Sequence, residues 1–310
     1  VVVKKGEYTA DSIAVYCEID SFIPHSIAPF LTKPGQFPKV YNEVEGQRLR
    51  TIKLRGQISQ GLLLSMSIRG SDGLVVGALF TEGDDVTEFL GVQKWEPPQE
   101  FRAANAKGSF PYFIPKTDCE RVQNLSHQVQ QWVEDEVVFQ KSEKLDGSSM
   151  TVFYKDGEVG CCSRNLELKD DGTSTFWETA KSEKLVEKLI SLGKNIALQG
   201  ELLGGQIQGN SYKITGFKFF LYDIYDIDNQ KYLAPAERQE IVKVLNKNGF
   251  PIKHVPIVGN IVLNHTVDEI LAMADGQSLN NANREGLVFK RLDGQFSFKA
   301  ISNWYLEKHQ

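Results

Sequence analysis

VVFQKSEKLDGSSMTVFY, residues 137–154, is the stretch around which the rest of the chain can be interpreted. Two apolar runs, each predicted as a strand, flank a polar hinge that holds Lys144, Asp146 and Gly147. Gly147 allows a tight turn close to a phosphate, and Asp146 could hold a metal ion or its waters. Lys144 can act as a nucleophile only when its amine is neutral, which requires burial or a nearby cation to lower its pKa from about 10.4. The pattern Lys-x-Asp-Gly alone is equally compatible with a charged hairpin tip.

The length and composition are those of a globular protein with about two domains. The 310 residues are 41% hydrophobic and 24% charged, and the net charge is −5. Nucleic-acid binding would therefore depend on local basic patches rather than on bulk charge. No apolar run approaches the roughly 20 residues that span a bilayer, so we expect no membrane association. No signal peptide is visible, which predicts an intracellular, cytoplasmic location, although the start at Val1 leaves room for a trimmed targeting segment.

The four cysteines are predicted to be reduced thiols in the protein core. They are Cys17, Cys119, Cys161 and Cys162. The last two are adjacent in a predicted strand and would point to opposite faces, and no Cys-x-x-Cys pair suggests zinc. Free thiols are favoured over disulfides, in agreement with a cytosol-like compartment.

The N-terminal third is predicted to be mostly β-structure. Strand-like runs separated by Gly- and Pro-containing turns cover residues 12–19, 49–58, 61–68 and 73–78. A small barrel of the oligonucleotide-binding (OB) type fits this pattern, and Trp95 to Pro98 is a plausible linker. Four cations, Arg48, Arg50, Lys53 and Arg55, fall within eight residues. They could follow a nucleic-acid backbone or form an ordinary solvated strand face.

The remainder of the chain alternates helix and strand signals. Helices are predicted over residues 117–129, 176–192, 235–248 and 266–274, the first and last opened by capping boxes. Strands are predicted over residues 160–165, 196–203, 217–227, 285–290 and 296–301. The fold class is therefore α+β, with an OB-type barrel in residues 1–98 and a second domain of antiparallel sheets and helices in residues 99–310.

Several later residues are ordinary one by one but form a chemical set together. They are Arg164, Glu201, Phe219, Glu285, Lys290 and Lys299. With Lys144 they provide a reactive amine, carboxylates for a divalent metal, an aromatic face for a base and cations for phosphates. This set suits nucleotidyl transfer through a lysine adduct.

The order and spacing of these residues resemble the covalent nucleotidyltransferases, a family that comprises RNA and DNA ligases and mRNA capping enzymes. Six ordered matches carry the resemblance over about residues 115–305. They are Lys144 to Gly147, Ser163 to Asn165, Gly200 to Leu202, Phe219 to Ile224, Glu285 to Lys290, and Phe298-Lys299. The β-rich N-terminal third is most similar in plan to RNA ligases of the Deinococcus and Naegleria type. The fifth family motif is usually Lys-x-Lys, whereas this chain has Ser297-Phe298-Lys299, so one phosphate-binding cation is missing or comes from elsewhere, such as Lys290 or an N-terminal arginine.

The resemblance implies an ATP-dependent RNA ligase that uses Mg²⁺ or Mn²⁺. Lys144 would attack the α-phosphate of ATP and carry AMP, which then activates a 5′-phosphate end for sealing by a 3′-OH. Asp146, Glu201 and Glu285 would hold the metal or its waters, with the ribose as an alternative contact for Glu201.

The resemblance also assigns the nucleotide contacts. Phe219 would stack on adenine, and Glu143 is a candidate contact to the exocyclic amine of adenine. Lys290 and Lys299 would contact the AMP phosphate, and Arg164 the sugar or the incoming 5′-phosphate.

The expected substrate is a nicked RNA duplex or RNA/DNA hybrid, bound by a monomer that needs no protein partner. Two alternatives remain open from the sequence. One is a GTP-dependent capping guanylyltransferase, and the other is a non-catalytic RNA-binding adaptor that kept the fold.

Overall fold

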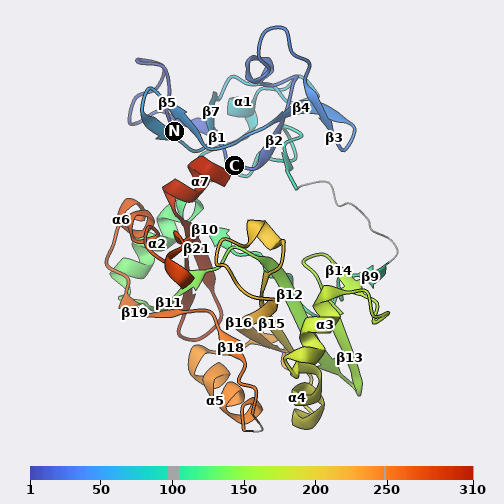
Figure 1. Ribbon diagram of the computed structural model, residues 1–310. Coiled ribbons are helices and arrows are strands. Elements are labelled where there is room, and N and C mark those ends of the chain that lie inside the picture. Colours follow the sequence, from blue (N-terminus) through green and yellow to red (C-terminus); the bar gives the residue numbers. More distant parts are fainter. Residues whose placement is uncertain (97–104, 248, 310) are drawn as a thin grey trace. The chain divides into compact units, whose positions relative to one another are not determined.

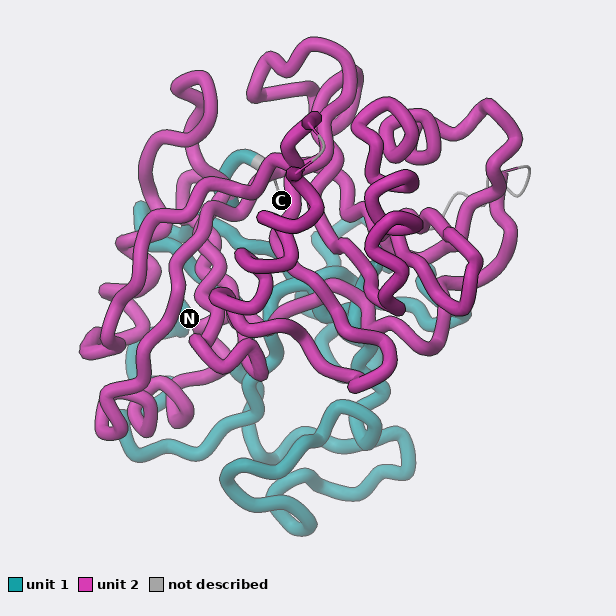
Figure 2. Tube along the Cα trace, turned by 90° about the horizontal axis from the view of Figure 1, so that it is seen from below, with its two compact units in different colours: residues 1–100, 306–310 teal, residues 101–305 magenta. Residues whose placement is uncertain are grey.

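The computed structural model describes residues 1–96, 105–247 and 249–309. The chain divides into two compact units, one formed by residues 1–100 and 306–310 and the other by residues 101–305 (Figure 2). The domain boundary predicted after Pro98 lies outside the described residues.

The N-terminal unit is built from short strands (Figure 1). They are β1 (Ala14–Cys17), β2 (Ser21–Pro24), β3 (Lys39–Tyr41), β4 (Val44–Arg48), β5 (Ile52–Leu54), β6 (Gln57–Ser59), β7 (Leu62–Ser65) and β8 (Gln93–Lys94). The described residues form one sheet in the order β3-β4-β2-β8 and the two antiparallel pairs β1-β7 and β5-β6. A short helix α1 (Val76–Leu79) and a 3₁₀ turn η1 (Pro29–Leu31) complete the unit, whose apolar core includes Val15, Ile23 and Val76.

Two strand predictions in this unit are wrong. Residues 49–58 form a hairpin rather than one strand, because Arg55 (φ 49°) and Gly56 (φ 84°) make a left-handed turn between β5 and β6. In residues 73–78 only Val75 forms a strand-like bridge, and the chain then turns into α1. The buried side chain of Val76 anchors this helical turn in the core.

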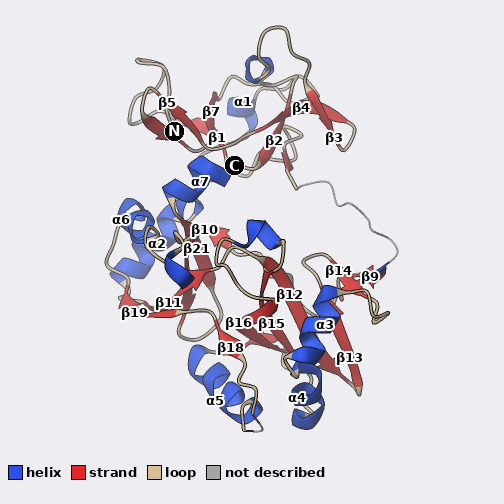
Figure 3. Ribbon diagram, viewed as in Figure 1, coloured by secondary structure: helices blue, strands red, loops and turns tan. Residues whose placement is uncertain are grey.

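The second unit contains two large sheets (Figure 3). Its strands are β9 (Ala106–Ser109), β10 (Glu120–Arg121), β11 (Val138–Lys144), β12 (Ser148–Lys155), β13 (Glu158–Cys162), β14 (Leu166–Leu168), β15 (Ile196–Gly204), β16 (Phe217–Asp226), β17 (Lys231–Tyr232), β18 (Lys253–His254), β19 (Ile257–Val262), β20 (Gly286–Arg291) and β21 (Ser297–Ile301). Within the described ranges, the larger sheet has the order β17-β16-β15-β12-β13-β14-β9, with β18 also paired to β16, and the smaller has the order β10-β21-β20-β11-β19. Most strand pairs are antiparallel, which confirms the predicted α+β class.

The helices of this unit pack on one side of each sheet. They are η3 (Val122–Asn124), α2 (Ser126–Glu134), α3 (Thr175–Ser182), α4 (Leu185–Leu192), η4 (Ile207–Asn210), α5 (Pro235–Leu245), α6 (Val267–Met273), η5 (Leu279–Asn281) and α7 (Asn303–His309), whose residues from 306 are counted with the first unit. Helices α3, α4 and α5 share a core with the larger sheet, and α2 and α6 share another with the smaller sheet. The opposite face of each sheet carries the residues described below.

The helix predictions agree best with the structure where the sequence contains a clear capping signal. Helix α6 has the predicted capping box between Thr266 and Glu269. The predicted helix over 176–192 is broken at Lys184, whose φ is 61°, and ends at Gly193 as expected. The helix predicted from Thr117 starts only at Ser126, because the preceding residues form β10 and η3.

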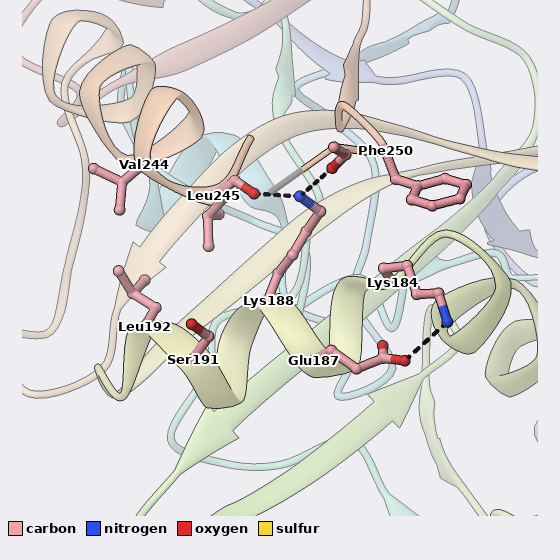
Figure 4. A pocket seen from close by; sticks show the side chains of 9 residues that line it. Lys184, Glu187, Lys188, Ser191, Leu192, Val244, Leu245 and Phe250 are labelled. Atoms are coloured by element: carbon pink, nitrogen blue, oxygen red, sulfur yellow. Dashed lines mark hydrogen bonds and ion pairs between the residues drawn. The ribbon is translucent and has the colours of Figure 1, made fainter. Parts of the chain in front are cut away.

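Helices α4 and α5 border a pocket of about 510 Å³ (Figure 4). The buried Lys188 of α4 donates hydrogen bonds to the carbonyl oxygens of Leu245 and Gly249 at the end of α5. A cation at the C-terminus of a helix is favourable, so Lys188 ties the two helices together.

The prediction of free cysteine thiols is confirmed, but Cys119 is half-buried rather than in the core. All four are free, and Cys161 and Cys162 point into separate cores on opposite faces of β13. In the part of the chain that the structure describes, no helix has the length and apolarity to cross a membrane.

Candidate active site

The hinge between β11 and β12 connects the two sheets of the second unit. Lys144 is the last residue of β11, and β12 begins at Ser148. A side chain at Gly147 would lie 2.6 Å from the carbonyl oxygen of Leu202, so the tight approach of the hinge to β15 requires glycine. The backbone N–H of Asp146 donates to the Tyr212 hydroxyl at 2.7 Å, which fixes the turn.

Lys144 is paired with Glu285, which immediately precedes β20. The Lys144 Nζ lies 2.9 and 3.0 Å from the two carboxylate oxygens of Glu285. Burial lowers the pKa of Lys144, but Glu285 and Glu201 outweigh burial and the net pKa is raised. The expectation that the protein itself lowers this pKa is therefore wrong. The carboxylates hold Lys144 in its protonated form, and the amine can become neutral only when they are otherwise neutralised.

Three carboxylates share the surroundings of Lys144. Burial raises the pKa of Glu201 to about 8; Lys144 opposes the shift, while Glu285 and Asp146 add to it. Burial also raises the pKa of Glu285, against the effect of Lys144. No group of three or more His, Cys, Asp or Glu side chains within the described segments is arranged as a metal-binding cluster.

These carboxylates nevertheless fit a divalent cation. Mg²⁺ usually keeps several waters and binds through one or two carboxylates together with substrate phosphates rather than in a complete protein cage. Carboxylates that repel one another, as Glu201, Glu285 and Asp146 do, would be stabilised by such a cation. The donor set of oxygen ligands suits Mg²⁺ or Mn²⁺.

The predicted phosphate-binding lysines lie on the same face of the smaller sheet as Lys144. The alternation of β20 and β21 places Leu287 and Phe298 in the core under α2 and α6, and Lys290 and Lys299 on the other face. Burial lowers the pKa of Lys299, and the nearby Lys144 adds to this shift. Lys299 therefore shares this face of the smaller sheet with Lys144.

Lys290 has a partner within the protein. Its ammonium group forms a buried ion pair with Asp223 of β16, which also lies 3.3 Å from Arg238 of α5. Arg238 in turn donates to Gln140 of β11 at 2.6 Å. This network of ion pairs and hydrogen bonds joins the two sheets. Because Lys290 is already paired with Asp223, its contact to a phosphate stays a prediction.

Arg121 is a basic residue that the motif comparison missed. Strand β10 runs parallel to β21 and places Arg121 opposite Lys299. The positive charge of Arg121 helps to lower the pKa of Lys299. Arg121 thus offers a further cation beside Lys299, where the sequence lacks a lysine at Ser297. The mistaken helix prediction over 117–129 concealed it, because Arg121 lies in a strand that pairs only in the tertiary structure.

The structure contradicts the assignment of Phe219 as the adenine-stacking residue. Phe219 is fully buried in the core between the larger sheet and its helices. Phe220 instead pairs across the sheet with Glu201 and packs against Leu145 and Tyr212 on the hinge side. Of the two phenylalanines, Phe220 therefore lies on the side of the candidate site, where it is 6% exposed and packs in a cluster that also includes Tyr212 and Tyr222.

In the structure, the Glu143 side chain does not lie on the same face of β11 as Lys144. Neighbouring residues of a strand point to opposite faces, so the Glu143 side chain lies behind β11. It accepts a hydrogen bond from Ser278 there, and the contact of Glu143 to the exocyclic amine of adenine stays a prediction.

Arg164 lies beyond the end of β13, where it is half exposed. Its guanidinium group donates to Asp118 at 2.8 Å. Its contact to the sugar or to the 5′-phosphate stays a prediction.

Comparisons with known proteins show the family to which this chain belongs. An RNA ligase family model matches residues 137–301, and an OB-fold domain model matches residues 1–66. The chain belongs to the RNA ligase family. A solved apo mutant structure of the Naegleria gruberi RNA ligase is 52% identical, with a TM-score of 0.89 over 99% of this chain and 89% of that one.

Two further structures of the same Naegleria ligase are similar to this RNA ligase. A mutant with AMP and Mn has 52% identity and a TM-score of 0.89, covering 99% of this chain and 90% of that one. A structure with PPi has 51% identity and a TM-score of 0.86, covering 99% and 89%. A search of the curated proteins finds no match.

The four N-terminal cations of this RNA ligase do not form one strand face. Arg48 is bonded to Asp20 and stacks on Trp95 at 3.8 Å, whereas Lys53 lies 3.3 Å from Glu307. Arg50 and Arg55 are exposed, the first between β4 and β5 and the second at the hairpin turn. Arg48 thus has a structural role, and nucleic-acid contacts of the four remain predictions.

Proposed function

We propose that this RNA ligase uses ATP and Mg²⁺ or Mn²⁺ to seal 3′-OH/5′-phosphate nicks in duplex RNA or in RNA/DNA hybrids. The observation that carries the proposal is the position of Lys144, at the end of β11 between the carboxylates of Glu285 and Glu201 and near Lys299. Structures of the similar Naegleria ligase contain ATP or AMP with Mn, and PPi. AMP and pyrophosphate are the two fragments that lysine adenylylation produces.

In the first step, the neutral amine of Lys144 attacks the α-phosphorus of ATP. A phosphorus–nitrogen bond forms, the bond to the bridging oxygen breaks, and pyrophosphate leaves. Lys144 must lose its proton beforehand, although Glu285 and Glu201 favour the protonated form. A divalent cation held by Asp146, Glu201 and Glu285 would neutralise these carboxylates and the phosphates, and so favour the neutral amine. Lys299 and Arg121 would bind phosphate oxygens.

In the later steps, AMP passes from Lys144 to a 5′-phosphate, and the 3′-OH displaces it as the strand closes. Phe220 would hold the adenine through base stacking, a contact worth about 1–3 kcal/mol. Exposed cations of the N-terminal unit, Arg50 and Arg55, would hold the nucleic-acid backbone. The monomeric state, the independence from a protein partner and the cytoplasmic location stay predictions.

The direct test is labelling of the full chain with radioactive ATP and, in parallel, GTP. Lys144→Ala should abolish the AMP adduct and sealing from ATP, yet still close some pre-adenylylated nicks, because that step uses AMP only as a leaving group. Lys141→Ala is the matched control, since this lysine lies on the same strand but on the opposite face. An adduct that survives Lys144→Ala, or labelling by GTP alone, would refute the proposal.

A further inference from the structure

A buried polar cluster lies directly behind the reactive lysine. Glu143, which precedes Lys144, is 9% exposed. Its carboxylate accepts a hydrogen bond from Ser278 at 2.5 Å and lies 3.9 Å from the guanidinium group of Arg284. Both side chains of this ion pair are almost completely buried, at 10% and 11% exposure. The proposed chemistry uses none of these groups.

Arg284 attaches this cluster to the end of helix α6. Its guanidinium group donates to the carbonyl oxygens of Met273 at 3.0 Å, Ala274 at 3.2 Å and Asp275 at 2.7 Å. A cation is favourable at the C-terminal end of a helix, where the carbonyl groups lack helical partners. Arg284 therefore fixes the loop between α6 and β20.

The ion pairs on the two faces involve consecutive residues. Lys144 pairs with Glu285 on the front face of β11, and Glu143 pairs with Arg284 behind it. Glu285 itself lies just outside the strand ladder, because β20 begins at Gly286. The direction of its carboxylate therefore depends on how the preceding loop is anchored.

A second anchor secures the backbone of the same two loop residues. The N–H of Ser302 donates to the carbonyl oxygen of Glu285 at 2.8 Å, and its hydroxyl donates to that of Arg284 at 3.1 Å. The Ser302 bonds hold the peptide groups, whereas Glu143 holds the Arg284 side chain. Without Glu143, the loop would lose its side-chain link to the strand that carries Lys144 and would keep only the backbone pairing of Gly286 with Lys144.

We propose that Glu143 and Arg284 are positioning residues that keep the Glu285 carboxylate in register with the Lys144 amine for adenylylation. The inference rests on the proposed function of Lys144. A displacement of about 1 Å at a reacting group can lower a rate by roughly a hundredfold. Loosening the rear pair should therefore slow the lysine attack more than it weakens ATP binding.

The test is single-turnover adenylylation of the full chain with radioactive ATP and Mn²⁺, compared with sealing of a pre-adenylylated nick. Glu143→Gln should lower the maximal adenylylation rate at least about tenfold, with the ATP concentration for half-maximal rate changed less than about threefold. Sealing of the pre-adenylylated nick should fall less, because Lys144 is not the nucleophile there. Lys141→Gln, which removes a charge from the same face of β11, should behave like the wild type.

A double variant tests whether the two residues act as a unit. Glu143→Gln combined with Arg284→Gln should be about as slow as the slower single variant, whereas independent residues would give multiplied losses. If Glu143→Gln fails to fold, Ser278→Ala removes only the hydrogen bond to Glu143 and should slow adenylylation selectively by about threefold.

Three results would overturn the inference. They are an unchanged adenylylation rate in Glu143→Gln or in its replacement Ser278→Ala, an equal loss in both reactions together with a lower melting temperature, and multiplied losses in the double variant. Each would show that the pair only stabilises the fold. Failure of the proposed function would appear differently, as a wild-type chain that forms no AMP adduct or one that forms it without Lys144.

Discussion

Replacing Glu201 by glutamine should make the ligand-free protein more stable in alkaline solution while abolishing ligation. Glu201 lies in β15 near Glu285 and Asp146, and burial raises its pKa to about 8. A carboxyl group with a raised pKa stabilises the folded state fully below its unfolded value, 4.5, and this contribution is lost as the pH rises through about 8. Glutamine carries no charge, so the variant avoids this loss.

The pKa of Glu201 sets the size of the effect. The difference between the ordinary value of 4.5 and about 8 corresponds to on the order of 5 kcal/mol, at about 1.36 kcal/mol per pKa unit. The pKa of about 8 already includes the attraction between Glu201 and Lys144. We therefore expect the stability of Glu201→Gln relative to the wild type to rise by about 4 kcal/mol between pH 4.5 and pH 8.5.

The assay is urea unfolding of both proteins at several pH values between 4.5 and 9, without nucleotide or metal. Glu158→Gln is the matched control, because it removes an exposed carboxylate from the neighbouring part of the same sheet. The control should show no growing difference from the wild type. A Glu201→Gln variant that is less stable at pH 8.5, or whose difference does not change with pH, would refute the reasoning.

Three further predictions follow from the described contacts. Phe219→Ala should lower the free energy of unfolding by about 3–5 kcal/mol. Phe220→Ala should instead raise the ATP concentration for half-maximal labelling about tenfold. If the two effects were reversed, Phe219 rather than Phe220 would be the residue that stacks on adenine. Burial lowers the pKa of His254 from 6.5 to about 4, so the wild type should lose on the order of 3 kcal/mol of stability as the pH falls between these values, and His254→Gln should lose less. Arg50→Glu should reduce the log–log salt slope of nick binding by about one unit, while Arg48→Ala should mainly lower the melting temperature; an unchanged slope for Arg50→Glu would exclude a phosphate contact.

The sequence alone predicted those features of the fold that depend on residues close together in the chain. The Lys144 hinge, the strand from Ile196 and the capped helix α6 were all predicted because turn glycines, apolar runs and capping boxes act within a few residues. The α+β class followed from the same signals. The ordered motifs also identified a ligase family, since their residue types and spacing together are specific.

The sequence could not determine which side of a strand faces the site. Phe219 and Phe220 are adjacent and equally aromatic, and only the packing of α3, α4 and α5 against the sheet decides which is core. Arg121 was missed for a similar reason. The strand β10 exists because it pairs with β21, which lies far away in the sequence.

The charge state of Lys144 was also decided by the tertiary structure. The carboxylates that raise its pKa come from Glu201 and Glu285, on strands and loops distant in the chain. The sequence predicted a lysine nucleophile, because its motif is local and occurs together with the other ordered motifs. Its partners on the front face, and Glu143 with Arg284 behind it, depend on how two sheets meet, since electrostatic interactions follow distance in space rather than separation along the chain.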